Sequence, residues 1–275
     1  GLFADDEPAD PEIKAEQLDG KHDNFFEEYG VRNFVATAHD ALSTFALDVD
    51  TGSYTITRRW LDEGIKPDPA SVRVEEFVNA FEYDYSTPRN GLDIHIDGGP
   101  SPFDESNIII RVGVQAAVID DRDRANAALT FVVDTSGSMD RAERLGLVKQ
   151  ALTEMISELD DDDTVAIVTY GDISAIVLEP TLVRDDDEIY DAIDDLRPGG
   201  STNLEAGLRT GYELAEQAYA EGGINRVILA SDGVANVGTT DPDALSREIT
   251  DRAINGIQLV TVGFGMGNYN DTIME

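Results

Sequence analysis

Two patterns of hydrophobic and polar positions divide this chain near residue 125. In the first part the predicted elements are short and mixed, and two segments alternate apolar with polar positions, as half-exposed strands do. These elements are a strand over residues 44–50, helices over residues 54–62 and 71–83, and strands over residues 92–97 and 108–114. We expect the helix over residues 71–83 to turn its apolar side chains inward, because they recur at helical spacing from Val74 to Phe81.

The second part alternates continuous apolar runs with amphipathic helical stretches, which is typical of a mostly parallel sheet with helices on both faces. The predicted strands cover residues 128–133, 164–170, 175–178, 226–230 and 257–264, and the predicted helices cover residues 145–159, 188–196, 204–218 and 244–254. A tight turn at Gly171 and Asp172 predicts that the two strands beside it are antiparallel neighbours. The predicted fold class is therefore α/β, with a doubly wound, mostly parallel sheet preceded by a small α+β region.

These patterns predict three parts along the chain. Residues 1–30 are acidic and lack periodicity, so we expect a flexible leader there. Residues 31–125 are expected to form the α+β region, and residues 126–275 the α/β domain. Because the sequence stops where another helix begins, we expect the α/β domain to be truncated at its C-terminal end.

Charge narrows the range of partners. The 56 acidic and 20 basic residues give a formal net charge of −36, which repels nucleic acid and anionic lipid. Scarce lysine beside this acid excess indicates a protein adapted to high salt, where screening weakens self-repulsion, and full stability in dilute buffer would contradict that hypothesis. No apolar run is long enough to span a bilayer, so we expect no direct membrane insertion by this chain. The lack of cysteine excludes thiolate metal sites.

Oxygen-bearing side chains follow or precede the predicted elements of the α/β domain in three loops. Asp134, Ser136 and Ser138 follow the first buried strand, Thr202 precedes a helix, and Asp232 follows the strand over residues 226–230. Loops after parallel strands gather at one edge of such a sheet, so the five residues can converge. Two carboxylates and three hydroxyls suit Mg²⁺ or Ca²⁺. The alternative for any one loop is a simple helix cap.

Glycines accompany each of these loops. Gly137 and Gly200 are expected to allow close backbone approach or a positive φ, and Gly233 follows the third-loop acid. We therefore interpret all three as residues that shape the loops.

The five residues resemble the metal-ion-dependent adhesion site (MIDAS) of von Willebrand factor type A (VWA) domains. The family pattern is Asp-x-Ser-x-Ser, then Thr, then Asp, and this chain matches it at all five positions over roughly residues 126 to 275. The resemblance implies a VWA/Rossmann-like fold that holds Mg²⁺, with Mn²⁺ or Ca²⁺ as alternatives, and a partner protein that offers a carboxylate. A helix starting near Asp140 is expected to favour that carboxylate. No general base or nucleophile accompanies the set, so we expect no catalytic residues and no enzyme.

Two segments of the first region, residues 43–51 and 72–81, resemble those that precede the VWA domain in bacterial YfbK-like cell-envelope proteins. In that group a further region follows the VWA domain. The resemblance implies an extracytoplasmic location, in the cell envelope or secreted, or lipid-anchored in the full-length protein.

Two other functions compete with adhesion. Asp48 and Asp50 resemble the strand-end Asp-x-Asp pair of Mg²⁺-dependent phosphotransferases of the haloacid dehalogenase type, although no regular α/β pattern follows them. The resemblance to VWA domains also allows an assembly role, because such domains occur as intracellular subunits of metal-insertion or ATPase machines, where they bind a fixed partner.

Overall fold

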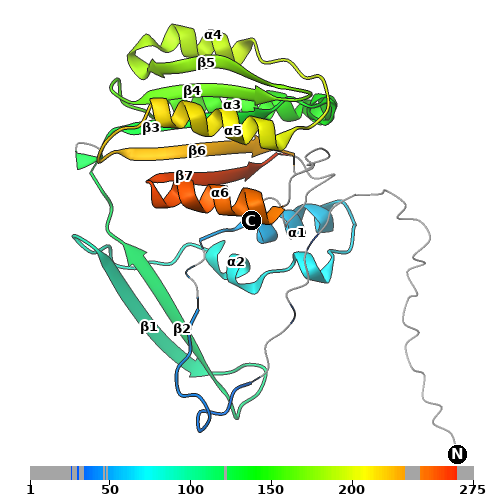
Figure 1. The fold of residues 1–275 in the computed structure, drawn as a ribbon. Coiled ribbons are helices and arrows are strands. Elements are labelled where there is room, and N and C mark those ends of the chain that lie inside the picture. Colours follow the sequence, from blue (N-terminus) through cyan, green and yellow to red (C-terminus); the bar gives the residue numbers. More distant parts are fainter. Residues whose placement is uncertain are drawn as a thin grey trace, which may run out of the picture.

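Two separate sheets make up the strand content of the residues that the computed structural model describes. These residues are Phe26, Gly30, 34–45, Leu47, 49–120, 123–232 and 242–264. Almost all of the predicted leader therefore lies outside the described residues. In Figure 1 a two-stranded sheet extends away from the layered five-stranded domain.

The larger sheet has the strand order β5-β4-β3-β6-β7. Its strands are β3 (Ala127–Asp134), β4 (Thr164–Tyr170), β5 (Ser174–Leu182), β6 (Ile224–Ser231) and β7 (Ile257–Gly263). The β3–β4, β3–β6 and β6–β7 pairs are parallel, whereas β5 runs antiparallel to β4. Both the mostly parallel sheet and the antiparallel neighbour predicted from the sequence are thus confirmed. The central strand β3 is buried along its whole length.

Helices cover both faces of this sheet and enclose two hydrophobic cores (Figure 1). The helices are α3 (Arg144–Ser157), α4 (Asp186–Asp194), α5 (Leu204–Gln217) and α6 (Pro242–Ile254), with short 3₁₀ segments η4 (Gly137–Glu143) and η5 (Val183–Asp185). Val148 of α3 and Ile189 of α4 belong to one core, and Leu208 and Tyr212 of α5 to the other. This arrangement confirms the doubly wound α/β class.

Two glycines let α5 lie directly on the sheet. A Cβ on Gly207 would come within 2.8 Å of the Tyr170 ring, and one on Gly211 would overlap Val132. Because side chains at either position would push the helix outward, the two glycines fix how α5 sits against β3 and β4. The N-terminus of α5 is capped by Asn203, whose side chain accepts a hydrogen bond from the Ala206 amide at 3.2 Å. The loop before Asn203 is thereby held at the carboxyl edge of the sheet.

The first region contains α1 (Gly52–Asp62), η2 (Pro69–Ser71) and α2 (Val74–Asn79). The α2 helix is shorter than predicted, and the expected burial of its apolar face is wrong: Val74 is 69% exposed and Phe81 56%. Glu76 is buried instead, because its carboxylate accepts the Ser53 amide at 2.6 Å in the first turn of α1. Because the Glu76 side of α2 faces inward, Val74 and Phe81 are left exposed.

The strand predicted over residues 44–50 is also absent from the described part of that segment, which has no regular structure and excludes Ala46 and Asp48. Phe45, Leu47 and Val49 are exposed there. Within the described residues, this apolar segment belongs to neither of the two sheets.

The smaller sheet is an antiparallel hairpin of β1 (Leu92–Pro100) and β2 (Ile108–Ala116). The β1 strand continues three residues beyond the end predicted at residue 97. On one face the register pairs apolar residues, as in Ile96 with Val112, and these side chains are exposed. On the other face Tyr85 stacks on His95 with ring centroids 4.6 Å apart. Within the described residues, none of the helices combines the length and apolarity needed to cross a membrane.

Candidate metal centre

Three loops meet at the carboxyl edge of the larger sheet. The first follows β3, the second precedes α5, and the third follows β6. Backbone hydrogen bonds join the first two loops: the Gly137 amide donates to the Gly200 carbonyl at 3.1 Å, and the Gly199 amide donates to the Thr135 carbonyl at 2.6 Å. Main-chain hydrogen bonds therefore hold together two loops that are far apart in the sequence.

Asp134 ends β3 and lies buried at the centre of this edge. One of its oxygens, Oδ1, accepts the Ser136 amide at 2.8 Å. The other, Oδ2, accepts hydroxyls from Ser231 at 3.1 Å and from Tyr170 at 3.3 Å. Burial raises the pKa of Asp134 above its ordinary value, and the nearby charge of Asp232 acts in the same direction, while the Ser136 hydrogen bonds oppose it. The carboxylate is held in place at an electrostatic cost.

The hydroxyl candidates lie on the same two loops. Ser136 and Ser138 place their Oγ atoms 2.9 Å apart, with Ser136 buried and Ser138 half-buried. Thr202 is 5% exposed and lies two residues beyond Gly200, whose carbonyl contacts the first loop. The structure thus brings these three residues to the edge that carries Asp134.

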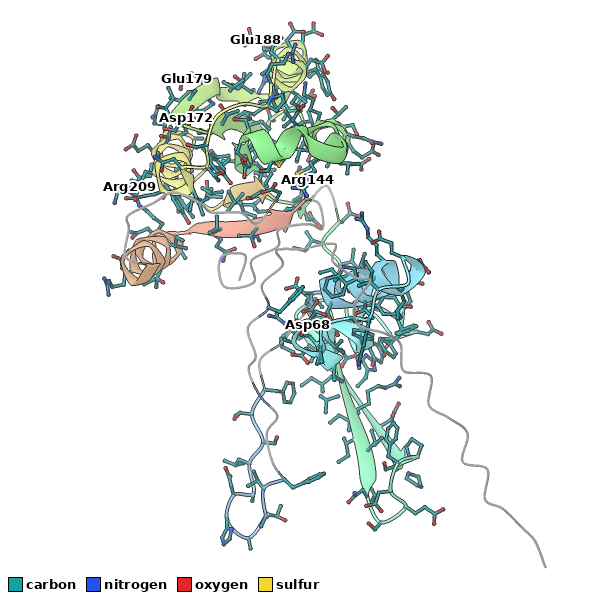
Figure 2. All side chains as sticks on the ribbon, turned by 90° about the vertical axis from the view of Figure 1, so that its right-hand side faces the viewer. Asp68, Arg144, Asp172, Glu179, Glu188 and Arg209 are labelled. Carbon is teal, nitrogen blue, oxygen red and sulfur yellow. The ribbon has the colours of Figure 1, made fainter. Side chains whose placement is uncertain are left out.

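Asp232 is 1% exposed and forms an ion pair that the sequence did not reveal. The Arg144 guanidinium lies beside the carboxyl edge of the sheet (Figure 2), with Nη1 2.5 Å from Asp232 Oδ2. Arg144 is the first residue of α3, because the segment from Gly137 to Glu143 is a 3₁₀ helix. The start predicted from periodicity at residue 145 is therefore correct to within one residue, whereas the α-helix start expected near Asp140 is wrong by one turn.

The glycines near these loops differ in whether their backbone conformation or the space for a Cβ requires glycine. Gly200 has a φ of +89°, a left-handed conformation that favours glycine. A Cβ on Gly137 would meet the Gly200 carbonyl at 3.7 Å, an ordinary contact, so close packing alone does not require glycine there. Gly171, predicted from the sequence only as part of a tight turn, is tighter, since its Cβ would lie 2.9 Å from the Gly199 carbonyl. Gly233 lies outside the described residues.

Asp172 holds the second loop through a hydrogen bond to its backbone. Its carboxylate accepts the Ser201 amide at 2.8 Å, and hydrogen bonding from Ser201 lowers the pKa of Asp172. This exposed acid therefore stays charged while it anchors the loop that carries Thr202.

The donor set suits a divalent metal. It offers two carboxylates and three hydroxyls, all oxygen ligands of the kind that Mg²⁺ prefers. Among the described residues there is no group of three or more His, Asp or Glu placed to hold a metal, so a cation here would depend on the hydroxyls as well as the acids. Asp134, Asp232, Ser136, Ser138 and Thr202 are the residues that could hold it.

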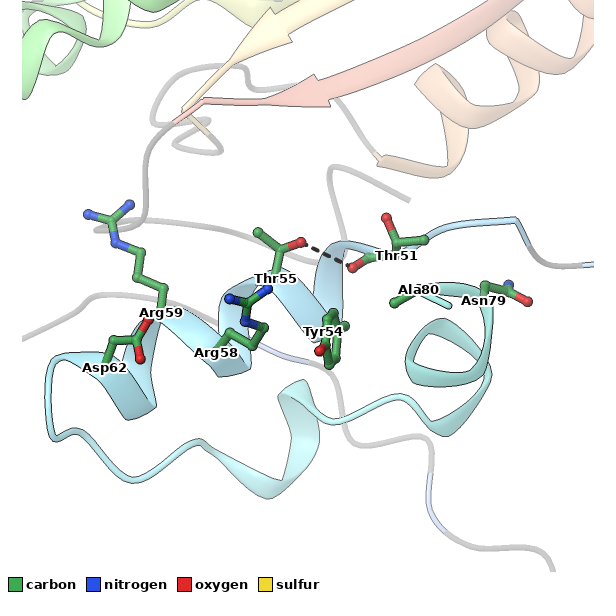
Figure 3. A pocket seen from close by; sticks show the side chains of 8 residues that line it. All are labelled: Thr51, Tyr54, Thr55, Arg58, Arg59, Asp62, Asn79 and Ala80. Atoms are coloured by element: carbon green, nitrogen blue, oxygen red, sulfur yellow. Dashed lines mark hydrogen bonds between the residues drawn. The ribbon is translucent and has the colours of Figure 1, made fainter. Parts of the chain in front are cut away.

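A second feature lies away from these loops. A pocket of 450 Å³ lies between α1 and α2 (Figure 3), and its lining residues are Thr51, Tyr54, Thr55, Arg58, Arg59, Asp62, Asn79 and Ala80. Arg58 stands over the Tyr54 ring at 5.7 Å, and Arg59 pairs with Glu63 at 3.0 Å. None of the five metal candidates lines this pocket.

Of the phosphotransferase pair, Asp48 lies outside the described residues, and Asp50 is exposed in irregular backbone.

Comparison with known proteins identifies the class of this chain. Residues 128–275 match the von Willebrand factor type A domain, and residues 20–111 match a second family described as von Willebrand factor. The chain belongs to the von Willebrand factor type A domain family, as its loop pattern predicted. Members of this family generally mediate protein interactions and metal-dependent adhesion, they typically bind a divalent metal, and most are non-enzymatic.

Particular relatives extend the likeness beyond that domain. The chain is 39% identical over 246 residues to the uncharacterized protein YfbK of Escherichia coli (strain K12), covering 86% of this chain and 43% of that protein. It is 31% identical over 149 residues to the magnesium-chelatase 67 kDa subunit of Chlorobaculum tepidum, covering 50% of this chain and 23% of that one. A solved von Willebrand factor type A structure from Catenulispora acidiphila aligns with a TM-score of 0.46 and 18% identity, covering 66% of this chain and 42% of that one. The chain spans less than half the length of these curated relatives.

Proposed function

We propose that this chain is a binding module that holds Mg²⁺ through Asp134, Ser136, Ser138, Thr202 and Asp232 and uses it to bind a carboxylate of a partner protein. The observation that carries this proposal is the convergence of three loops at one sheet edge, with both acids buried and fixed. Mn²⁺ and Ca²⁺ are alternatives, because their oxygen-ligand preferences overlap.

The balance of charge favours recognition of an acid. Three of the five candidate ligands are neutral hydroxyls, so the set leaves a bound divalent cation more electrophilic than a set made of carboxylates alone would. When bound, that cation supplies a Lewis-acidic position for an incoming oxygen ligand. The protein residues around it position and bury the ligands, and the set carries no nucleophile or general base for turnover. We therefore propose binding without catalysis.

A pair of peptide libraries tests this function. One library carries a fixed Asp among mixed residues, and the other carries Asn at that position. We expect the immobilised protein to retain the Asp library in Mg²⁺ and to release it in EDTA, while Asp134→Asn retains neither. Equal retention of the two libraries, or retention that survives EDTA, contradicts the proposal.

An assembly role is the second candidate, and the likeness to a magnesium-chelatase subunit favours it. In that case the same site would bind one fixed partner inside the cell. We propose instead that the protein works outside the cytoplasm, because the envelope-group resemblance covers both the first region and the VWA domain. Fractionation of cells that express the native protein separates the two, since recovery in the cytoplasmic fraction contradicts the extracytoplasmic proposal.

A further inference from the structure

Arg144 stands in an unusual position for a cation. It is the first residue of α3, and the first turn of a helix favours negative charge because its free amides are partly positive. The side chain is nevertheless almost fully buried, with 9% of it exposed. A buried guanidinium needs a charged partner, and Asp232 supplies it from 88 positions away.

The partner is one of the two acids proposed to hold the metal. Asp134 and Asp232 are both buried, and their charges act on each other. A single guanidinium on Asp232 Oδ2 therefore offsets one of the two negative charges of the site. A divalent cation at the same acids would face that guanidinium as a like charge at short range, where little water screens it.

We propose that Arg144 is a built-in counter-cation of this site, which holds Asp232 when no metal is bound and competes with the divalent cation for its carboxylate. This inference rests on the proposed metal site and adds a regulation to it. Metal binding then requires the Arg144–Asp232 pair to open, so the affinity for Mg²⁺ is set below what the oxygen ligands alone would give. The exchange also links metal occupancy to the start of α3.

The test replaces the guanidinium by an uncharged side chain in Arg144→Gln. Calorimetric titration with Mg²⁺ alone should show at least a tenfold tighter affinity than in the unmodified protein. Thermal unfolding should show a lower midpoint in EDTA, because the buried Asp232 loses its guanidinium partner, and a larger rise on adding Mg²⁺. Unchanged or weaker Mg²⁺ binding overturns the proposal and makes Arg144 a purely structural residue.

Arg184→Gln is the matched control. Arg184 pairs with Asp162 at the same 2.5 Å, but both side chains are exposed. It removes the same charge from the chain, so it should leave the Mg²⁺ affinity unchanged. If both variants tighten binding equally, the effect is one of net charge and the proposal fails.

The Asp232→Asn background separates competition from simple repulsion. Without the carboxylate, Arg144→Gln should no longer tighten the residual Mg²⁺ binding, and equal tightening there contradicts competition for Asp232. If Arg144→Gln does not fold in EDTA, folding restored by Mg²⁺ supports the proposal, and failure to fold in saturating Mg²⁺ overturns it. Absence of any saturable Mg²⁺ site in the unmodified protein is a different result, which rejects the metal site itself.

Discussion

Ser231 donates a hydrogen bond to Asp134 Oδ2 at 3.1 Å, across 97 positions of sequence. The two residues end the neighbouring parallel strands β6 and β3. This bond joins the third loop to the first through a hydroxyl that belongs to neither the Asp-x-Ser-x-Ser pattern nor the third-loop acid. The side chains at the edge are thus arranged by the protein's own contacts.

Removing that hydroxyl should loosen the site. In Ser231→Ala, Asp134 Oδ2 loses the Ser231 hydroxyl and keeps that of Tyr170, so we expect the free energy of unfolding to fall by about 1 kcal/mol and Mg²⁺ affinity to weaken. Urea unfolding and calorimetry measure the two effects. Ser174→Ala is the control, because Ser174 bonds Thr210 at 2.8 Å away from the loops. A loss of Mg²⁺ affinity in the control as large as in Ser231→Ala contradicts this role.

Replacing Asp134 by Asn should have opposite effects on stability without metal and on metal binding. Its raised pKa means that the protonated acid is favoured by folding, so its stabilising contribution is complete below the unfolded pKa of about 3.8 and is lost as pH rises through the folded value. Asp134→Asn should therefore raise the unfolding temperature in EDTA at neutral pH by roughly 2 °C or more. The same variant should lose the stabilisation by Mg²⁺. If Asp134→Asn is less stable than the unmodified protein in EDTA at neutral pH, this assignment is contradicted, most clearly if the difference in stability shrinks in acid.

Gly171, in the turn between β4 and β5, and Gly199, in the second loop, provide a steric test. A Cβ on Gly171 would lie 2.9 Å from the Gly199 carbonyl, whereas a Cβ on Gly199 would meet nothing within 4 Å. We expect Gly171→Ala to cost about 1–3 kcal/mol of stability and to weaken Mg²⁺ binding, because the backbone that carries Thr202 must shift. Gly199→Ala should change both by much less. Equal effects of the two substitutions in urea unfolding would falsify the close approach.

Asp163 governs acid stability at the opposite edge of the domain. Burial opposes its charge, but hydrogen bonds from Arg124 and from the amides of Ala127 and Asp160 outweigh this and lower the pKa of Asp163. Its contribution is therefore present above the unfolded pKa and is lost as pH falls through the folded value. Asp163→Asn should cost about 3 kcal/mol near neutral pH, and the difference should shrink in strong acid. Asp162→Asn, at an exposed ion pair, is the control and should cost far less.

Hydrophobic periodicity predicted the larger sheet well because burial on both faces leaves long apolar runs. The strand β4 was placed at its observed bounds, and the antiparallel position of β5 followed from the tight turn at Gly171. The first region was harder. There Glu76 is buried as the acceptor of the Ser53 amide of α1, and this contact overrides the apolar periodicity that predicted an inward face for α2.

The candidate site likewise contains residues that the sequence predicted and residues that it did not. A spacing motif names residues that follow strands, and the strands bring them to one edge. Tyr170 and Arg144 carry no such motif, because their roles depend on which atom of a distant acid they reach. Helical periodicity placed the start of α3 to within one residue, but it does not encode which distant acid the Arg144 side chain reaches.

The most direct test of the metal site is a calorimetric Mg²⁺ titration of the EDTA-treated protein, in salt high enough to screen diffuse binding to its acidic surface. The variants are Asp134→Asn and, as a matched control that removes one acid from the hairpin, Asp93→Asn. The account predicts one saturable site in the unmodified protein and in Asp93→Asn, and none in Asp134→Asn. Identical isotherms for all three would show that the acids bind the metal only diffusely, and would contradict the account.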